Sequence, residues 1–150
     1  MTSARLNLAL ALFALSGMVM ADPGAVEGRW LTQDGDGWIQ VSLVGDSLEG
    51  RIAGAPPGRP TEREVDDLNP DPALRGRPLD GLTIMSGFEH NGDGKWTGGT
   101  VYDPNSGKTY RCTVTLINAN TLKIRGYLGV SLFGRSETCL LYTSDAADDR

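Results

Sequence analysis

The segment GWIQVSLV, residues 37–44, alternates apolar and polar side chains, and this alternation decides the fold class. In an extended chain, Ile39, Val41 and Leu43 fall on one face and the polar side chains between them fall on the other. A helix would instead repeat its apolar positions about every three to four residues. The segment therefore predicts a β-strand with one buried face, which is typical of an antiparallel sheet.

Similar runs recur on both sides of this segment, and each is separated from the next by turn-forming residues. No stretch between residues 22 and 138 shows sustained helical periodicity. Consecutive strands that are joined by short turns pair with each other, and closing the sheet removes its exposed edges. The sequence therefore predicts an all-β fold, an antiparallel up-and-down barrel of about eight strands, with a two-sheet sandwich as the alternative. The predicted strands are 27–31, 37–44, 48–53, 82–88, 95–102, 109–117, 121–127 and 131–138.

The inward faces of these strands give a predicted interior that is either a packed core or a cavity wall. A barrel of this size can be filled by its own side chains or can hold one small ligand. Trp38 and Trp96 are candidates for either role, and both are kept as possible ligand-binding residues. The other predicted interior residues are Ile39, Val41, Leu43, Leu48, Ile52, Ile84, Phe88, Val114 and Leu116.

The N-terminal segment, residues 1–21, has the pattern of a secretory signal helix. Arg5 is followed by a short apolar stretch and by a V-M-A sequence that ends at Ala21. The apolar stretch is shorter than the roughly 20 residues that a membrane span needs. We therefore expect a periplasmic or secreted protein with no membrane span after cleavage, and a single β-barrel domain at residues 22–138.

The C-terminal segment CLLYTSDAADDR, residues 139–150, resembles translated read-through of a sequencing adapter. We expect a non-native tail that breaks the last strand after Thr138. Cys112 would then be the domain's lone cysteine, and such a residue on a strand is usually a small buried hydrophobe. The alternative is a disulfide between Cys112 and Cys139 in an oxidising compartment.

The composition argues against several function classes. The net charge is −5 and no basic block is present, so nucleic acid is a poor partner. His90 is the single histidine, which leaves no set of side chains for zinc or for a catalytic triad, and we expect no catalytic residue, metal or cofactor.

Residues 89–100 begin like a calcium loop, but Thr100 stands where a bidentate carboxylate is needed. A β-hairpin is predicted there instead.

The sequence Gly28-Arg29-Trp30 opens the predicted barrel directly after the signal segment. This G-x-W motif resembles that of the lipocalins. The resemblance implies that Trp30 plugs the closed end of the barrel, and that an arginine from a late strand packs across the indole by a cation–π contact. Arg125 and Arg135 are the candidates for that arginine.

The long connection at residues 54–81 contains DDLNPDPALRGRPLDG at positions 66–81. Its prolines stiffen the chain, and residues 71–74 are predicted to form one helical turn. The adjacent Asp66 and Asp67 are expected to be solvated. Arg75 and Arg77 either form ion pairs inside the connection or grip an anion over the barrel mouth, since guanidinium groups match carboxylate and phosphate. The ligand-binding candidates here are Asn69, Asp67, Arg75 and Arg77.

Several motifs together resemble the exported bacterial family called domain of unknown function 2147, which is lipocalin-like and has no established activity. They are the connection itself, GKWTGG at 94–99, YDPNSGKTY at 102–110, LKIRGYLG at 122–129 and LFGRSET at 132–138. The resemblance leaves the function open, and the predicted barrel leads us to expect a non-enzymatic periplasmic protein that binds a small, partly apolar molecule. The alternative is a protein-binding module, such as an exported enzyme inhibitor or an envelope-associated factor, whose partner is an envelope protein.

Overall fold

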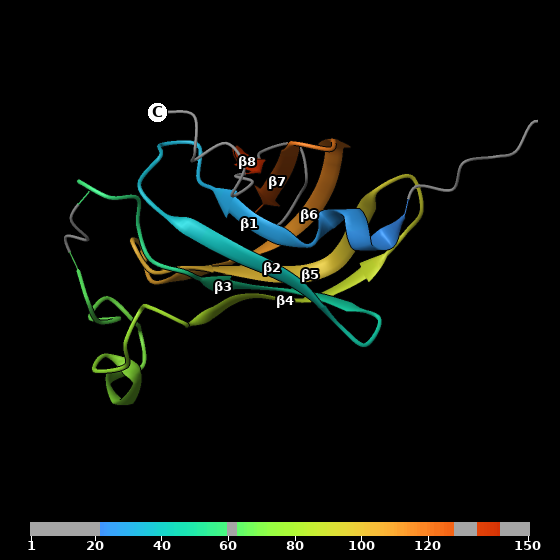
Figure 1. Ribbon diagram of the computed structural model, residues 1–150. Coiled ribbons are helices and arrows are strands. Elements are labelled where there is room, and N and C mark those ends of the chain that lie inside the picture. Colours follow the sequence, from blue (N-terminus) through green and yellow to red (C-terminus); the bar gives the residue numbers. More distant parts are fainter. Residues whose placement is uncertain (1–21, 60–62, 128–134, 142–150) are drawn as a thin grey trace, which may run out of the picture.

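The computed structural model describes residues 22–59, 63–127 and 135–141, and it forms a closed antiparallel barrel of eight strands (Figure 1). Each strand pairs with the next, and the last pairs with the first. The predicted up-and-down barrel is thus confirmed, and the sandwich alternative is wrong. The predicted signal helix lies outside the described residues. The elements are η1 (Pro23–Val26), β1 (Gly28–Leu31), β2 (Trp38–Val44), β3 (Ser47–Ile52), η2 (Pro72–Leu74), β4 (Thr83–His90), β5 (Lys95–Asp103), β6 (Lys108–Asn118), β7 (Thr121–Tyr127) and β8 (Arg135–Leu141).

The strand register places the predicted apolar faces inside the barrel. On β2 and β3, Ile39 lies opposite Ile52 and Leu43 lies opposite Leu48, so both strands point their apolar side chains at the same interior. The predicted interior residues are all either buried or packed against the core. The buried core also contains Val26, Trp30, Met85, Trp96, Cys112 and Leu122.

Met85 is the interior residue that simple alternation misses. Strict alternation along β4 would place Met85 on the outer face, between Ile84 and Ser86. The pairing of β4 with β3 shifts register near Gly50, and Gly87 has a φ of 76°, so the alternation breaks between Met85 and Phe88. Both side chains are consequently buried in the core.

Two glycines provide the space that these side chains fill. A Cβ atom at Gly50 would lie 2.6 Å from the sulfur of Met85, and a Cβ atom at Gly99 would lie 2.4 Å from the ring of Phe88. Both distances are well inside van der Waals contact. The interior of the barrel therefore depends on bare backbone opposite its large side chains.

The last strand corrects the prediction that the barrel ends at Thr138. β8 continues to Leu141, and Leu140 and Leu141 pair with Leu31 and Trp30 of β1. The extended backbone of Leu140 and Leu141 pairs with the edge of β1, and this pairing closes the barrel.

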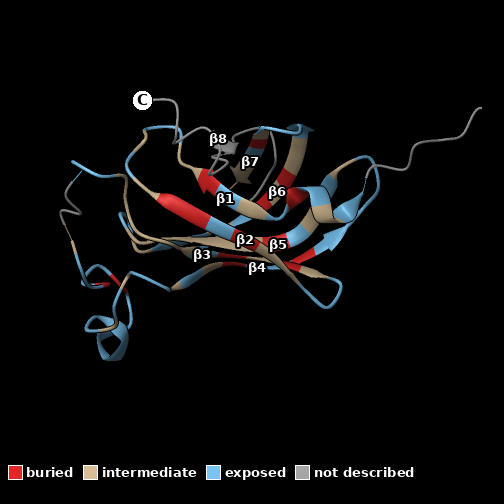
Figure 2. Ribbon diagram, viewed as in Figure 1, coloured by how far each residue is buried: buried red, intermediate tan, exposed pale blue. Residues whose placement is uncertain are grey.

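One end of the barrel is closed by the segment that precedes β1. Trp30 is fully buried, and its indole N–H donates a hydrogen bond of 2.9 Å to the carbonyl of Val26 in η1. Asp22 caps η1 by accepting from the backbone N–H of Gly24. Trp30 is thus buried beside η1, and its role as a plug stays a prediction. Figure 2 shows that the segments coloured as buried lie mainly on the strands.

The connection between β3 and β4 hangs from the opposite end of the barrel (Figure 1). Its predicted helical turn is confirmed as η2, whose cap Asp71 accepts from the N–H of Ala73 at 3.0 Å. Val65 and Pro78 form an isolated antiparallel bridge, so the two limbs of the connection run side by side. The connection is a folded unit of its own and not a linker.

We expect Gly99→Ala to destabilise the protein by about 1–3 kcal/mol, because the new methyl group would overlap the Phe88 ring. Chemical denaturation measures this change. Gly76→Ala is the control, since a Cβ atom there meets nothing within 4 Å and φ is not positive. Equal stability of both variants would contradict this account of the interior.

Candidate functional site

A cavity of about 1140 Å³ occupies the end of the barrel opposite η1 and opens to solvent. The β1–β2 loop, the connection and the β5–β6 turn surround its mouth. Ligand pockets typically measure roughly 300–1,000 Å³, so this cavity is large enough for one small molecule. Its inner wall consists of Ile39, Ile52, Ile84, Met85, Val101, Tyr110, Cys112 and Ile124.

The wall is mainly apolar and belongs to the barrel strands. Val101 on β5 pairs with Tyr110 on β6, and Met85 on β4 pairs with Val101, so three neighbouring strands contribute adjacent side chains. The thiol of Cys112 donates to the carbonyl of Tyr110 at 3.7 Å. Cys112 is buried, as predicted. Among the described lining residues, a molecule that enters here meets hydrocarbon, the thiol of Cys112 and aromatic rings.

The connection is held against the barrel by the carboxylate of Asp66. Asp66 is fully buried and accepts hydrogen bonds from the Tyr102 hydroxyl at 2.5 Å, Asn69 Nδ2 at 2.8 Å and Arg77 Nε at 2.9 Å. The expectation that Asp66 is solvated is therefore wrong. Tyr102 belongs to β5 and the other two donors belong to the connection, so this carboxylate joins the two parts of the fold.

These contacts also set the protonation of the pair. Burial alone raises the pKa of Asp66, but the hydrogen bonds from Tyr102, Asn69 and Arg77 and the nearby guanidinium charge outweigh it and hold the pKa below its usual value. Burial and the hydrogen bond to Asp66 raise the pKa of Tyr102. At neutral pH the pair is therefore a charged acceptor and a neutral donor.

A second set of contacts docks the connection on the β5–β6 turn. Arg63 donates to Asp67 through Nε at 2.7 Å and to the carbonyl of Pro104 through a terminal nitrogen at 2.8 Å. Gly107 has a φ of 68°, and a Cβ atom there would lie 2.2 Å from the carbonyl oxygen of Leu68. The turn thus approaches the connection more closely than any residue other than glycine allows.

The predicted ligand-binding residues of the connection take part in this docking. Arg77 pairs with Asp66, which is the internal ion pair that the sequence offered as one alternative. Arg75 donates Nε to the carbonyl of Asn69 at 2.8 Å, and Asp67 pairs with Arg63. The four predicted ligand-binding residues of the connection are not among the described residues that line the cavity: Asp67, Asn69, Arg75 and Arg77. Anion binding by Arg75 and Arg77 stays a prediction.

The two tryptophan candidates differ in position. Trp38 borders the cavity at the start of β2, and the guanidinium of Arg29 lies 5.5 Å from the centre of its ring. Trp96 is buried in the core away from the cavity lining, and its ring contacts that of His90 with a centroid distance of 4.7 Å. Trp38 is therefore placed for ligand contact, whereas Trp96 serves the core.

The arginine candidates for the barrel end also differ in what the structure describes. Arg125 lies opposite Thr113 and next to the core-facing Ile124, which places it on the outer side of β7. Arg135 lies opposite Gly126 at the start of β8, and its side chain is outside the described residues. No cation–π contact to Trp30 occurs among the described side chains, and a contact from Arg135 stays a prediction.

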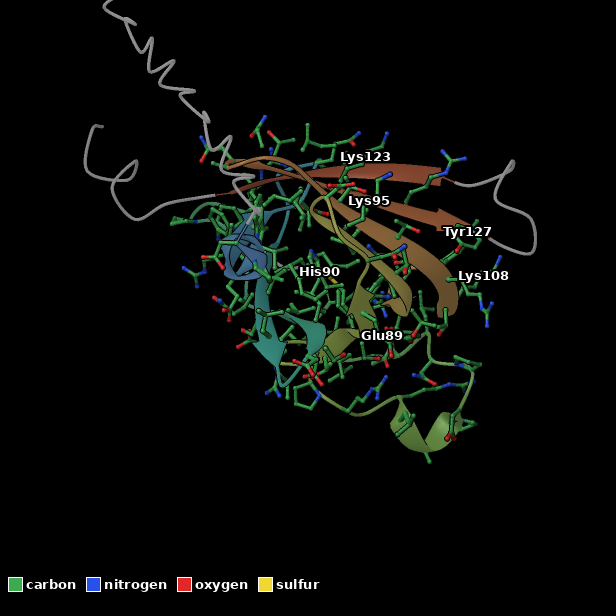
Figure 3. All side chains as sticks on the ribbon, turned by 90° about the vertical axis from the view of Figure 1, so that its right-hand side faces the viewer. Glu89, His90, Lys95, Lys108, Lys123 and Tyr127 are labelled. Atoms are coloured by element: carbon green, nitrogen blue, oxygen red, sulfur yellow. The ribbon has the colours of Figure 1, made fainter. Side chains whose placement is uncertain are left out.

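Residues 89–100 form the predicted hairpin between β4 and β5. Asp93 has a φ of 51° and lies between Gly92 and Gly94, which also have positive φ. His90 ends β4 at this hairpin, so it lies at the other end of the strand from the connection, and Figure 3 labels its side chain together with that of Glu89. Within the described ranges, no three His, Cys, Asp or Glu side chains are grouped to hold a metal ion.

The pair that sequence reasoning missed is Asp66 and Tyr102. Each lies in one of the two most specific motifs, the connection and the YDPNSGKTY turn. The two residues are 36 positions apart, and nothing in the sequence shows that they form a hydrogen bond. The folding of the connection against β5 brings them together.

A closed eight-stranded barrel with one plugged end and one open cavity defines a lipocalin-like protein. A family model described as "uncharacterized protein conserved in bacteria (DUF2147)" matches residues 28–140, and the chain belongs to this family. No curated protein matches the chain in sequence. No helix within the described ranges has the length and apolar character that crossing a membrane requires.

Two solved structures are similar to this chain. One is protein HP1028 from Helicobacter pylori, described as belonging to the lipocalin family, with a TM-score of 0.72 and 22% identity over 82% of this chain and 86% of that one. The other is a redesigned β-barrel with a TM-score of 0.45 and 13% identity over 84% of this chain and 98% of that one. The first likeness supports the fold.

We expect Asp66→Asn to destabilise the protein by about 1–3 kcal/mol at neutral pH, because it removes the charge beside Arg77 and replaces one of the two acceptor oxygens by an NH2 group that meets a donor. The pKa of Asp66 is lowered by folding, so its stabilisation is complete above the unfolded pKa near roughly 4 and is lost as the pH falls through the folded value.

Urea denaturation across a pH series tests this expectation. The difference between wild type and Asp66→Asn should shrink as the pH falls below about 4. Asp67→Asn, which removes an exposed carboxylate, is the control and should cost less than about 1 kcal/mol. A difference between wild type and Asp66→Asn that grows on acidification would contradict the account.

Proposed function

We propose that this protein is a non-enzymatic binding protein of the periplasm or the extracellular space, which holds a small, partly apolar molecule in the open end of its barrel. The cavity of about 1140 Å³ with its apolar inner wall is the observation that carries this proposal. Burial of apolar surface gives roughly 25 cal/mol per Å² removed from water, which is the main source of affinity for such a ligand.

The fixed position of the connection also supports binding. Asp66 and Arg63 tie it to β5 and the β5–β6 turn, so Glu64, Leu79 and Asp80 stand at the mouth before any ligand arrives. A wall that is already in place spares the ligand the cost of ordering it. The signal-like N-terminal sequence supports the envelope location.

A catalytic role has less support. Among the described residues that line the cavity there is no histidine, and His90 lies toward the closed end of the barrel. Cavity residues with acid–base potential are the carboxylates at the mouth and the tyrosines. The Thr32 hydroxyl donates to the Asp36 carboxylate at the mouth, but the backbone N–H groups of Asp36 and Gly37 donate to the same hydroxyl, so this contact serves the β1–β2 loop.

The double variant Val101→Trp with Ile124→Trp should weaken binding of the neutral fluorescent probe N-phenyl-1-naphthylamine, because two indoles would take up space along the apolar inner wall. Probe fluorescence during titration measures the affinity. The control is Gln40→Trp with Lys123→Trp, two exposed strand positions outside the lining, which adds the same aromatic groups to the outer surface. Unchanged binding in the cavity variant would contradict the proposal.

The second candidate is a protein-binding module, and one observation favours it. The connection exposes apolar side chains at Val65, Leu68 and Leu74, and Leu68 is 50% exposed. Exposed apolar side chains on a rigid protrusion are typical of protein contacts. A wild-type chain that binds no probe at all would favour this second function over the first.

A further inference from the structure

The mouth of the cavity is predominantly acidic. Two carboxylates come from the β1–β2 loop, two from the limbs of the connection and one from the end of β5, whereas the basic groups both lie on one limb of the connection. The described lining residues thus include five carboxylates and two guanidinium groups. The carboxylates are Asp34, Asp36, Glu64, Asp80 and Asp103, and the basic residues are Arg59 and Arg63.

Several of these charges already have partners within the fold. Arg63 is bound to Asp67 and to the Pro104 carbonyl, so it is committed to docking the connection. Asp36 accepts from the Thr32 hydroxyl, and Asp103 accepts from the Ser106 hydroxyl.

More negative than positive side chains at the mouth remain without a partner in the part of the fold that the structure describes. Asp34, Glu64 and Asp80 are exposed, and no partner among the described residues engages them. Arg59 is the one basic lining residue in the described ranges that is left to oppose them. The open charge at the mouth is therefore negative, and it comes from two separate segments of the chain.

Aromatic rings add a second feature that favours a cation. Tyr110 is half-buried, lines the cavity and packs against the core. Tyr102 lines it as well, but the guanidinium of Arg77 already lies 5.5 Å from the centre of its ring, so Tyr110 is the better placed of the two rings for a ligand cation. The faces of such rings attract positive charge, most strongly where water is excluded.

The arginines that could have attracted an anion are engaged elsewhere. Arg77 is paired with Asp66, and Arg75 donates to the Asn69 carbonyl outside the lining. An anionic head group at the mouth would meet the exposed carboxylates with Arg59 as its one described counterion.

From these observations we infer that the molecule held in the cavity is an amphiphile with a positively charged head, such as an ammonium or guanidinium group, joined to an apolar body. The body lies against the isoleucines and Met85 of the inner wall, and the head lies among Asp34, Glu64 and Asp80 at the mouth. This inference rests on the proposed function, because it assigns the chemical class of ligand to the same cavity.

Competition against N-phenyl-1-naphthylamine on the full chain tests the inference. Dodecyltrimethylammonium and dodecanoate share a chain length and differ in the sign of the head group, and both are used below their micelle concentrations. At low salt, the cation should displace the probe at about tenfold lower concentration than the anion. The preference should shrink at high salt, since exposed charges are screened.

The triple variant Asp34→Asn, Glu64→Gln, Asp80→Asn should reduce the cation-to-anion preference to about one, where each affinity is compared with the same variant's affinity for the neutral probe. The matched control is Asp46→Asn, Glu89→Gln, Asp93→Asn. It removes the same net charge outside the cavity lining and should keep the preference.

The outcomes separate the two proposals. Probe binding with equal or better competition by dodecanoate would overturn the cationic ligand and leave the proposed function standing. An equal loss of preference in both triple variants would overturn it too, since net charge alone would then explain the effect. Absence of probe binding to the wild-type chain would overturn both.

Discussion

The buried carboxylate of Asp66 is the interaction on which the functional end of this barrel depends. A carboxylate that is removed from water is costly unless hydrogen bonds satisfy its oxygens, and here Tyr102, Asn69 and Arg77 do so. Tyr102 belongs to the barrel and the other two to the connection. The same residue thus makes the connection fold upon itself and attaches it to β5.

The consequence for the cavity is geometric. Residues that flank Asp66 and its partner Arg77 in sequence, namely Glu64, Leu79 and Asp80, form part of the cavity mouth. Their positions follow from the docking of the connection, because all three residues belong to the connection and none to a strand. The connection is consequently a wall of the cavity, and its conformation sets both the width and the charge of the entrance.

Much of the fold is predictable from sequence because it depends on local alternation. Ile39, Val41 and Leu43 specify both a strand and its buried face, and neighbouring strands repeat that information. The prediction fails where alternation breaks. Met85 is hidden by the shift of register around Gly50 and Gly87, and the end of β8 was missed because residues 139–141 belong to the segment that resembles translated adapter sequence.

The candidate site was less accessible to sequence reasoning because it is made by contacts across long separations. Ion pairs between the arginines of the connection and its own carboxylates were one of the predicted alternatives, but the contact of Asp66 with Tyr102 was not predicted. Asp66 and Tyr102 belong to two separate motifs, and the hydrogen bond between their side chains joins these motifs. Lining residues such as Arg59 and Glu64 become visible only when the connection is folded back over the barrel end.

Hydrogen–deuterium exchange of the full chain, with and without N-phenyl-1-naphthylamine, tests the central claim that a docked connection walls a ligand cavity. The backbone N–H groups of Asp66, Asn69 and Leu79 are hydrogen-bonded, so they should exchange slowly even in the free protein. The probe should add protection in the connection and the β1–β2 loop and leave the β2–β3 turn unchanged. Exchange of these amides at the rate of an unfolded chain, or protection confined to the closed end, would contradict the account.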